Sequence, residues 1–243
     1  MLIDSSIKNS IQDMGINIFM KNYVSSTNDY IQYKYIKDQT PVIIFTNNQR
    51  NPRGQRGSRW SDYQNHSLSF SLCLKLEGQI ANYENLSQIV GLSVIKSCEN
   101  LDINNLKLKV PNDIMLEGKK VCGILIENII DNPSYFYSTI GIGLNLSIPN
   151  RLLNIIDGNP GNLKINLSQT GVLLRDILKS IFSNISILKT IEKIKLKGSN
   201  KIFIKMDIEG DEYLSLNEYI KSHNSILGFA IEFHDINNRS NEF

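Results

Sequence analysis

Residues 67–74 read SLSFSLCL, and this strict alternation is the feature that most constrains the fold. The large apolar set is Leu68, Phe70, Leu72 and Leu74, and the small set is Ser67, Ser69, Ser71 and Cys73. A sustained period of two predicts a β-strand with one buried face. The serine-bearing face is then either exposed to solvent or one wall of a pocket.

Further strands are predicted by short apolar or alternating runs that end at turn residues. They are residues 42–45, 106–110, 114–116, 121–130 and 135–142. The turn Glu117-Gly118-Lys119 predicts that the third and fourth of these form a hairpin. Two helices are predicted at 82–100 and 168–188. Hairpin strands with few helices indicate an α+β fold, in which a mixed β-sheet carries helices packed on one face.

A chain of 243 residues fits one large domain with a small appendage. We expect the main domain to span residues 1–188 and a small C-terminal module to span residues 189–243. Within that module, residues 202–208 and 227–233 alternate and predict two strands.

Composition excludes several classes of protein. The 26 basic and 24 acidic residues leave a net charge of +2, which argues against a dedicated nucleic-acid-binding domain. The cysteines Cys73, Cys98 and Cys122 match neither a disulfide framework nor a metal site. No run reaches the roughly 18 apolar residues of a membrane span, and residues 1–15 do not resemble a secretory signal. We therefore expect a soluble, cytoplasmic protein.

The segment 49–60, QRNPRGQRGSRW, combines four arginines, two glycines and a tryptophan between two predicted strands. Glycine lets a backbone approach a ligand closely, and arginine offers forked donors for phosphate or carboxylate. The segment is neither a Walker loop nor a dinucleotide fingerprint. Taken alone it is more typical of a solvated basic loop.

Four shorter segments are ambiguous when each is taken alone. Residues 25–29, SSTND, are typical of a helix cap. Residues 109–113 read KVPND, and residues 119–127 read KKVCGILIE, with a glycine inside a predicted strand. Residues 141–145 read GIGLN, in which a lone Gly-x-Gly is weak evidence of a ligand site.

In this order the five segments resemble the catalytic domain of biotin protein ligases, over residues 20–147. The corresponding family patterns are G-R-G-R-x-G-R-x-W, K-W-P-N-D and K-x-x-G-I-L. The resemblance implies the class II aminoacyl-tRNA synthetase-like fold of biotin and lipoate ligases, followed by a diverged SH3-like barrel. The first motif begins at Ser25, so we expect the monofunctional type without an N-terminal DNA-binding domain.

The resemblance also assigns roles to motif residues. The biotin-binding set is Ser26, Thr27, Asn28, Gln49, Arg53, Gly54, Gln55, Lys120, Gly123 and Leu125. The ATP- or adenylate-binding set is Arg56, Trp60, Asn112, Asp113 and Asn145, and Asp113 is also the candidate ligand of Mg²⁺. Arg53 and Lys120 are the expected catalytic residues, because they would balance negative charge at the α-phosphate. An isolated Lys120 would instead be typical of an exposed turn.

The implied activity is that of a biotin–[acetyl-CoA-carboxylase] ligase. Such an enzyme uses ATP and Mg²⁺ to convert biotin into biotinyl-5′-AMP, and then transfers biotin to a lysine of a biotin carboxyl carrier protein. That acceptor belongs to acetyl-CoA carboxylase or to another biotin-dependent carboxylase. We expect no DNA or membrane partner, and a monomer or weak homodimer.

The motifs depart from the family pattern at Pro52, Gln55, Ser58 and Val110. Gln55 matters most, because the family arginine at this position helps to retain the activated intermediate. Two alternatives stay open. One is a lipoate–protein ligase, which shares the fold and the adenylate chemistry. The other is a catalytically weakened biotin-binding protein, which the departures at Gln55 and Ser58 motivate. A biotin-responsive repressor would need a helix-turn-helix ahead of the motifs.

Overall fold

The computed structural model describes residues 5–35, 41–46, 48–156, 159–196, 202–208 and 226–233. The chain divides into two compact units, Met1–Lys179 and Ser180–Phe243. Helix α5 (Leu167–Leu196) runs through the boundary between them. The division at residue 188 and the barrel fold of the second part stay predictions.

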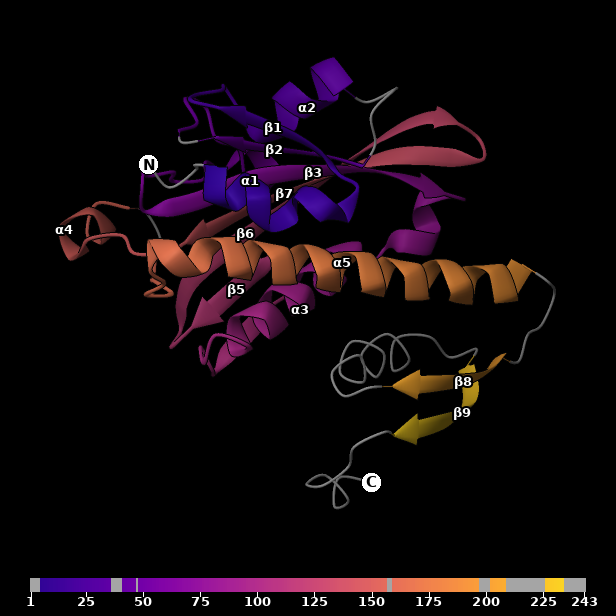
Figure 1. Ribbon diagram of the computed structural model, residues 1–243. Coiled ribbons are helices and arrows are strands. Elements are labelled where there is room, and N and C mark those ends of the chain that lie inside the picture. The colour runs from indigo at the N-terminus through magenta and orange to yellow at the C-terminus, as the bar shows by residue number, and fades with distance from the viewer. Residues whose placement is uncertain are drawn as a thin grey trace. The chain divides into compact units, whose positions relative to one another are not determined.

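The first unit is built on a sheet of seven strands (Figure 1). They are β1 (Asn17–Lys21), β2 (Val42–Thr46), β3 (Ser67–Glu77), β4 (Leu106–Lys109), β5 (Asp113–Leu116), β6 (Lys119–Asn132) and β7 (Tyr135–Asn145). Their order across the sheet is β1-β2-β3-β7-β6-β5-β4. The β1–β2 pair is parallel and the other pairs are antiparallel. The predicted α+β class with a mixed sheet is therefore confirmed.

The predicted hairpin between β5 and β6 is also confirmed. Glu117 and Gly118 form its turn with φ angles of 52° and 73°, the left-handed values that tight hairpin turns require. The register then pairs Asp113 with Gly123 across the hairpin. On its other side β6 pairs Gly123 with Gly143 of β7, which places three of the predicted motifs side by side.

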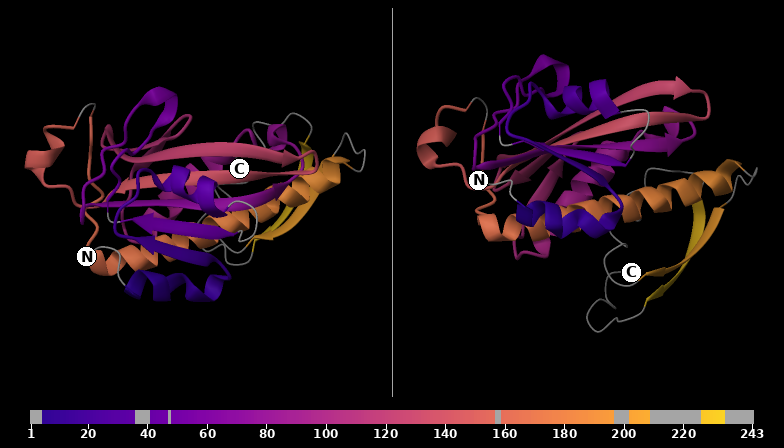
Figure 2. Two further views of the ribbon diagram at one scale, coloured as in Figure 1. Left: turned by 90° about the horizontal axis from the view of Figure 1, so that it is seen from above. Right: turned by 45° about the horizontal axis from the view of Figure 1, so that its top comes forward.

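One face of the sheet carries most of the helical mass. The large apolar side chains of β3 on this face, among them Leu68, Phe70 and Leu72, are fully buried. Helix α3 (Leu86–Glu99) packs here, with Gly91 against the side chains of Leu108 and Ile124. Helix α1 (Ser5–Ile11) and the start of α5 lie on the same side (Figure 2).

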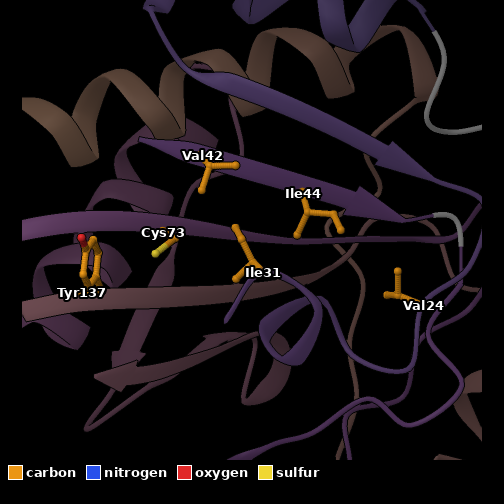
Figure 3. Packing of buried hydrophobic residues seen from close by; sticks show 6 residues of the cluster. All are labelled: Val24, Ile31, Val42, Ile44, Cys73 and Tyr137. Atoms are coloured by element: carbon orange, nitrogen blue, oxygen red, sulfur yellow. The ribbon is translucent and has the colours of Figure 1, made fainter. Parts of the chain in front are cut away.

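The opposite face carries helix α2 (Thr27–Tyr35), which packs over β2, β3 and β7. Its Ile31 is fully buried in a cluster with side chains from the strands beneath it (Figure 3). The other members are Val24, Val42, Ile44, Cys73 and Tyr137. Helices thus occupy both faces, whereas the sequence predicted one. A helix of only nine residues is too short to show a recognisable apolar stripe.

The remaining elements of this unit are short. They are η1 (Gln12–Met14), η2 (Gln55–Gly57), η3 (Ile80–Tyr83) and α4 (Asn150–Leu153). The helix predicted at 82–100 consists of the end of η3 followed by α3, and the one predicted at 168–188 is the longer α5. Strand β1 and helix α1 were not predicted.

The second unit contains the end of α5 and the strands β8 (Ile202–Ile208) and β9 (Ile226–Phe233). These two strands were predicted from their alternation, and they pair in parallel. Within the described ranges, no helix combines the length and the apolar character that crossing a membrane requires.

Candidate functional site

A cavity of about 210 Å³ opens on the face of the sheet that α2 leaves partly uncovered. All five sequence motifs contribute to its lining, and so does Ser69, so the serine-bearing face of β3 is a pocket wall. The predicted ligand residues that line it are Ser26, Thr27, Asn28, Gln49, Arg53, Gly54, Gln55, Trp60, Asn112, Asp113, Lys120, Gly123 and Leu125.

A second cavity of about 220 Å³ adjoins the first. Both are lined by Arg59, Trp60 and Lys120, so these side chains stand where the two spaces meet. Asn145, which was predicted to bind the nucleotide, lines the second cavity. Arg56 is exposed and lines neither of these two cavities.

The polar end of the first cavity forms where α2 begins. The Ser26 hydroxyl caps the helix by accepting a 3.5 Å hydrogen bond from the Asp29 amide, so the capping interpretation of SSTND is confirmed. The amide and hydroxyl of Thr27 both donate to Gln49 Oε1, at 2.9 and 3.2 Å. From β3, Ser71 Oγ lies 2.8 Å from the Thr27 hydroxyl oxygen. These contacts join α2, β3 and the arginine-rich loop.

Asn28 extends this network to strand β6. Its Nδ2 donates to Glu127 Oε2 at 2.8 Å and to the Leu125 carbonyl at 3.3 Å, while its Oδ1 lies 2.5 Å from Ser71 Oγ. A Cβ at Gly141 would collide with Asn28 Oδ1. Glycine is therefore required at this position of GIGLN for Asn28 to reach the sheet. Sequence reasoning assigned no role to Glu127.

The arginine-rich loop is attached to the same carboxylate. Arg53 NH2 donates to Glu127 Oε2 at 2.8 Å and also to Asp29 Oδ1. Partial burial opposes the charge of Arg53, but the pairing with Glu127 and Asp29 outweighs it and raises the pKa of the guanidinium. Within the loop, the Gly54 amide donates to the Ser58 carbonyl at 2.8 Å. The loop is thus folded on itself and held against α2 and β6.

Lys120 projects from the beginning of β6, and its Nζ lies 2.6 Å from Asp113 Oδ1 on β5. The same ammonium lies 5.7 Å from the centre of the Trp60 ring. The Lys120 amide donates to the Asn159 carbonyl, and its carbonyl accepts from the Gly161 amide, both at 2.7 Å. The backbone N–H and C=O of Lys120 are therefore both held by hydrogen bonds to neighbouring backbone, which is not typical of a solvated turn residue.

Trp60 lies over glycines of β6 and β7. A Cβ at Gly143 would lie 2.5 Å from Trp60 Cε2, and one at Gly123 would lie 3.1 Å from Cζ3. The indole Nε1 is buried and has no hydrogen-bond partner among the described residues, and the same holds for Asn145 Oδ1. Beside the second cavity, one buried donor and one buried acceptor thus have no partner in the described part of the chain.

Asp62 follows Trp60 by two positions and lies behind the polar end of the first cavity. Its carboxylate accepts hydrogen bonds from the Gln49 amide at 3.1 Å, from Gln49 Nε2 at 3.3 Å and from Ser69 Oγ at 3.0 Å. Burial is the main influence on this group, and it raises the pKa of Asp62 to about 6 in spite of these three donors. Sequence reasoning did not identify this residue.

Comparisons with known proteins show which family the chain belongs to. Residues 21–145 match the model of the biotin/lipoate A/B protein ligase family. The chain belongs to this family, which is defined by a protein ligase domain. Within the family it is homologous to the biotin protein ligases.

Two curated relatives illustrate the homology. The bifunctional ligase/repressor BirA of Salmonella typhimurium is 27% identical over 147 residues, covering 60% of this chain and 46% of the relative. The biotin–[acetyl-CoA-carboxylase] ligase of Paracoccus denitrificans is 31% identical over 97 residues, covering 39% and 40% of the two chains. The chain spans about half the length of the curated relatives it matches, or less.

Solved structures show the same fold. A point mutant of biotin protein ligase from Aquifex aeolicus, in complex with biotin, has a TM-score of 0.55 and 25% identity, covering 70% of each chain. The ligase from the same organism in complex with biotin and ATP has a TM-score of 0.50 and 26% identity, again covering 70% of each chain. The sheet and helices of the first unit are therefore those of a biotin protein ligase catalytic domain.

Proposed function

We propose that the chain is an ATP-dependent biotin–protein ligase that acts in the cytoplasm. In the first step a carboxylate oxygen of biotin bonds to the α-phosphorus of ATP, the α–β phosphoanhydride bond breaks, and pyrophosphate leaves. In the second step a lysine amine attacks the acyl carbon of biotinyl-5′-AMP, and AMP leaves. The proposed acceptor is a biotin carboxyl carrier protein, as expected of a biotin–[acetyl-CoA-carboxylase] ligase.

The observation that carries this proposal is the place of Lys120 on the wall shared by two adjoining cavities. A ligase of this kind must hold a carboxylic acid and a nucleotide so that the carboxylate meets the α-phosphate. One space for each substrate, with a cation between them, provides that arrangement. The Aquifex relative with bound biotin and ATP supports the identity of both substrates.

Lys120 and Arg53 would act by stabilising charge. The compact ammonium of Lys120 can contact oxygens of both the carboxylate and the phosphate as negative charge develops between them. Arg53 is paired through its NH2 with Asp29 and Glu127. A guanidinium has five N–H donors, so Arg53 can bind a phosphate or carboxylate oxygen while it keeps these partners.

The residues of the second cavity would bind the nucleotide. Trp60 lines this cavity with a flat aromatic side chain, and Asn145 lines it with an amide side chain. Nucleobases present both donors and acceptors at their edges, and aromatic side chains stack on their faces. These features support the assignment of Trp60 and Asn145 to the adenylate.

Magnesium would enter with ATP. Asp113 is the one carboxylate that lines the first cavity in the described part of the chain, and it is already paired with Lys120. The described residues hold no group of three or more His, Cys, Asp and Glu side chains suited to a metal. This fits an ion bound mainly by phosphate oxygens, with Asp113 as its protein ligand. When bound, the ion would neutralise phosphate charge.

A lipoate–protein ligase is the second candidate, and the polar end of the first cavity argues against it. Thr27, Asn28 and Gln49 there suit the cyclic urea of biotin, whereas the dithiolane ring of lipoate has neither an N–H nor a carbonyl group. A catalytically weakened biotin-binding protein is the third candidate, motivated by Gln55 in place of the family arginine.

The test is to incubate the chain with ATP, Mg²⁺, biotin and a carboxyl-carrier domain, and to detect the product on a streptavidin blot. A parallel reaction with lipoate and a lipoyl domain tests the second candidate. Pyrophosphate release without acceptor tests the third, because a weakened protein binds biotin but forms no adenylate. A working ligase gives biotin-dependent pyrophosphate release and a labelled acceptor.

A further inference from the structure

Asp62 is an ionisable group near the cavity that the proposed chemistry does not use. Its carboxylate is partly buried behind the polar end, and the three hydrogen bonds that it accepts from described residues come from neutral donors, two on Gln49 and one on Ser69. An enclosed carboxylate without a cationic partner costs free energy, and the raised pKa of Asp62 reflects that cost. Asp62 therefore needs an explanation other than stability.

The carboxylate helps to determine which way the Gln49 side chain faces. An ionised carboxylate only accepts hydrogen bonds, so it holds the Nε2 amide group of Gln49 toward Asp62. The Oε1 atom then faces α2, where it accepts from both the amide and the hydroxyl of Thr27. The hydroxyl proton of Thr27 is thereby committed to Gln49.

A second carboxylate does the same at the other end of the network. Glu127 accepts from Asn28 Nδ2, so Asn28 Oδ1 faces Ser71 Oγ. Ser71 has one proton, which points toward the oxygens of Thr27 and Asn28. The hydroxyl protons of Thr27 and Ser71, and the side-chain N–H groups of Asn28, are thus directed at protein neighbours. Lone pairs on oxygen are what remains for a ligand.

We infer that Asp62 is a positioning residue for substrate selection: by fixing the Gln49 amide, it makes the polar end of the cavity an array of acceptors that favours ligands with N–H groups. A cyclic urea carries two N–H groups, and a dithiolane ring carries none. The inference rests on the proposed function, since it concerns how that site distinguishes biotin from lipoate.

The test compares Asp62→Ala and Asp62→Ser with Asp62→Asn at pH 8, where Asp62 of the parent is ionised. Both truncations remove the acceptor that holds Nε2, so that only the donors of Thr27 still orient the Gln49 amide. Asp62→Asn should preserve the arrangement, because the Gln49 backbone N–H donates to the same carboxylate oxygen as Nε2 and so selects the amide oxygen of asparagine. Glu77→Gln, at an exposed position of β3, is the matched control.

Calorimetry gives the Kd values for biotin and lipoate, and pyrophosphate release gives the KM for ATP. We expect both truncations to weaken biotin binding at least about 10-fold, the scale for buried hydrogen-bonding groups that lose a partner. The lipoate Kd and the KM for ATP should change less than about twofold, and Asp62→Asn should stay within about threefold of the parent for biotin.

The outcomes separate the inference from the proposed function. A parent protein that does not bind biotin would refute the proposed function. A parent that binds biotin, with folded truncations that bind it equally well, would overturn the inference. Equal losses for biotin, lipoate and ATP, or loss of the circular dichroism signal in both truncations, would assign Asp62 to structural integrity and would also overturn it.

Discussion

The Lys120 ammonium and the Asp113 carboxylate lie 2.6 Å apart across the β5–β6 hairpin, at the wall between the two cavities. Their side chains are 36% and 21% exposed, so the pair is screened less than a surface ion pair. Sheet register places Asp113 opposite Gly123, three positions along β6 from the lysine. The hairpin thus holds the cation in place before any substrate binds.

Replacing Lys120 tests its role directly. Lys120→Ala should lower biotin-dependent pyrophosphate release by at least about 100-fold, because it removes a charge contact placed where charge develops. Lys120→Arg should recover little activity, since a planar guanidinium does not replace a compact ammonium. Lys119→Ala, one position earlier and exposed, should be nearly silent. Parent-like turnover of Lys120→Ala would show that the lysine is not catalytic.

Arg53 should control the exposure of its loop. Arg53→Ala removes the contacts with Asp29 and Glu127, so trypsin should cleave after Arg56 and Arg59 several-fold faster than in the parent. The effect is moderate because partly exposed ion pairs contribute about 0–1 kcal/mol. Mass spectrometry of the fragments measures the rates. Arg151→Ala on α4 is the control, and equal cleavage in both variants would contradict the attachment of the loop.

Gly143 should tolerate no side chain. Gly143→Ala places a methyl group 2.5 Å from the Trp60 ring, so the indole must move, at a cost of about 1–3 kcal/mol in the free energy of unfolding. ATP binding, measured by calorimetry, should weaken as well. In Gly91→Ala the added methyl meets the end of the flexible Leu108 side chain on the other face of the sheet. That variant should keep the Kd of the parent for ATP.

Asp62 should give the free energy of unfolding a distinctive pH dependence. Its pKa is about 6 in the folded protein against 3.8 ordinarily, so between these values the folded state binds more protons than the unfolded state. Stability from this group therefore falls as pH rises from about 4 to 6, by up to about 3 kcal/mol. Urea denaturation at pH 4.5 and 7.5 should show that Asp62→Asn gains stability at the higher pH relative to the parent.

A control separates this effect from general titration of carboxylates. Glu77→Gln should follow the pH profile of the parent at both pH values, because Glu77 is exposed. If the difference between Asp62→Asn and the parent is the same at both pH values, the pKa of Asp62 is not raised.

Features encoded by local sequence could be predicted. Alternation identified β3, and the turn at Glu117 and Gly118 identified the hairpin that holds Lys120. Strand β1 was missed because none of its five residues is fully buried, and its parallel partner β2 gives no local signal of the pairing. The position of α2 depends on Ile31 and Tyr30 meeting a cluster of side chains from the strands, which no local pattern indicates.

The site shows the same division. Thr27, Gln49 and Lys120 could be assigned to one site from the sequence, because each lies in a segment that matches a motif of the family. Asp62 and Glu127 were missed because what distinguishes them is their contacts, and the partner of Glu127 lies 99 positions away in the chain. A contact between residues so far apart in the chain cannot be predicted from local spacing, because it forms only when α2 packs beside β6 in the folded protein.

The glycines at 123, 141 and 143 let the side chains of Trp60 and Asn28 pack directly against the backbone of β6 and β7. The same three glycines line the first cavity. Any substitution at these positions adds atoms beneath Trp60 or Asn28 and displaces that side chain. An inhibitor that binds through Trp60 and Asn28 would therefore be hard to escape by mutating these glycines, because the displaced side chain would also be lost to the proposed substrates.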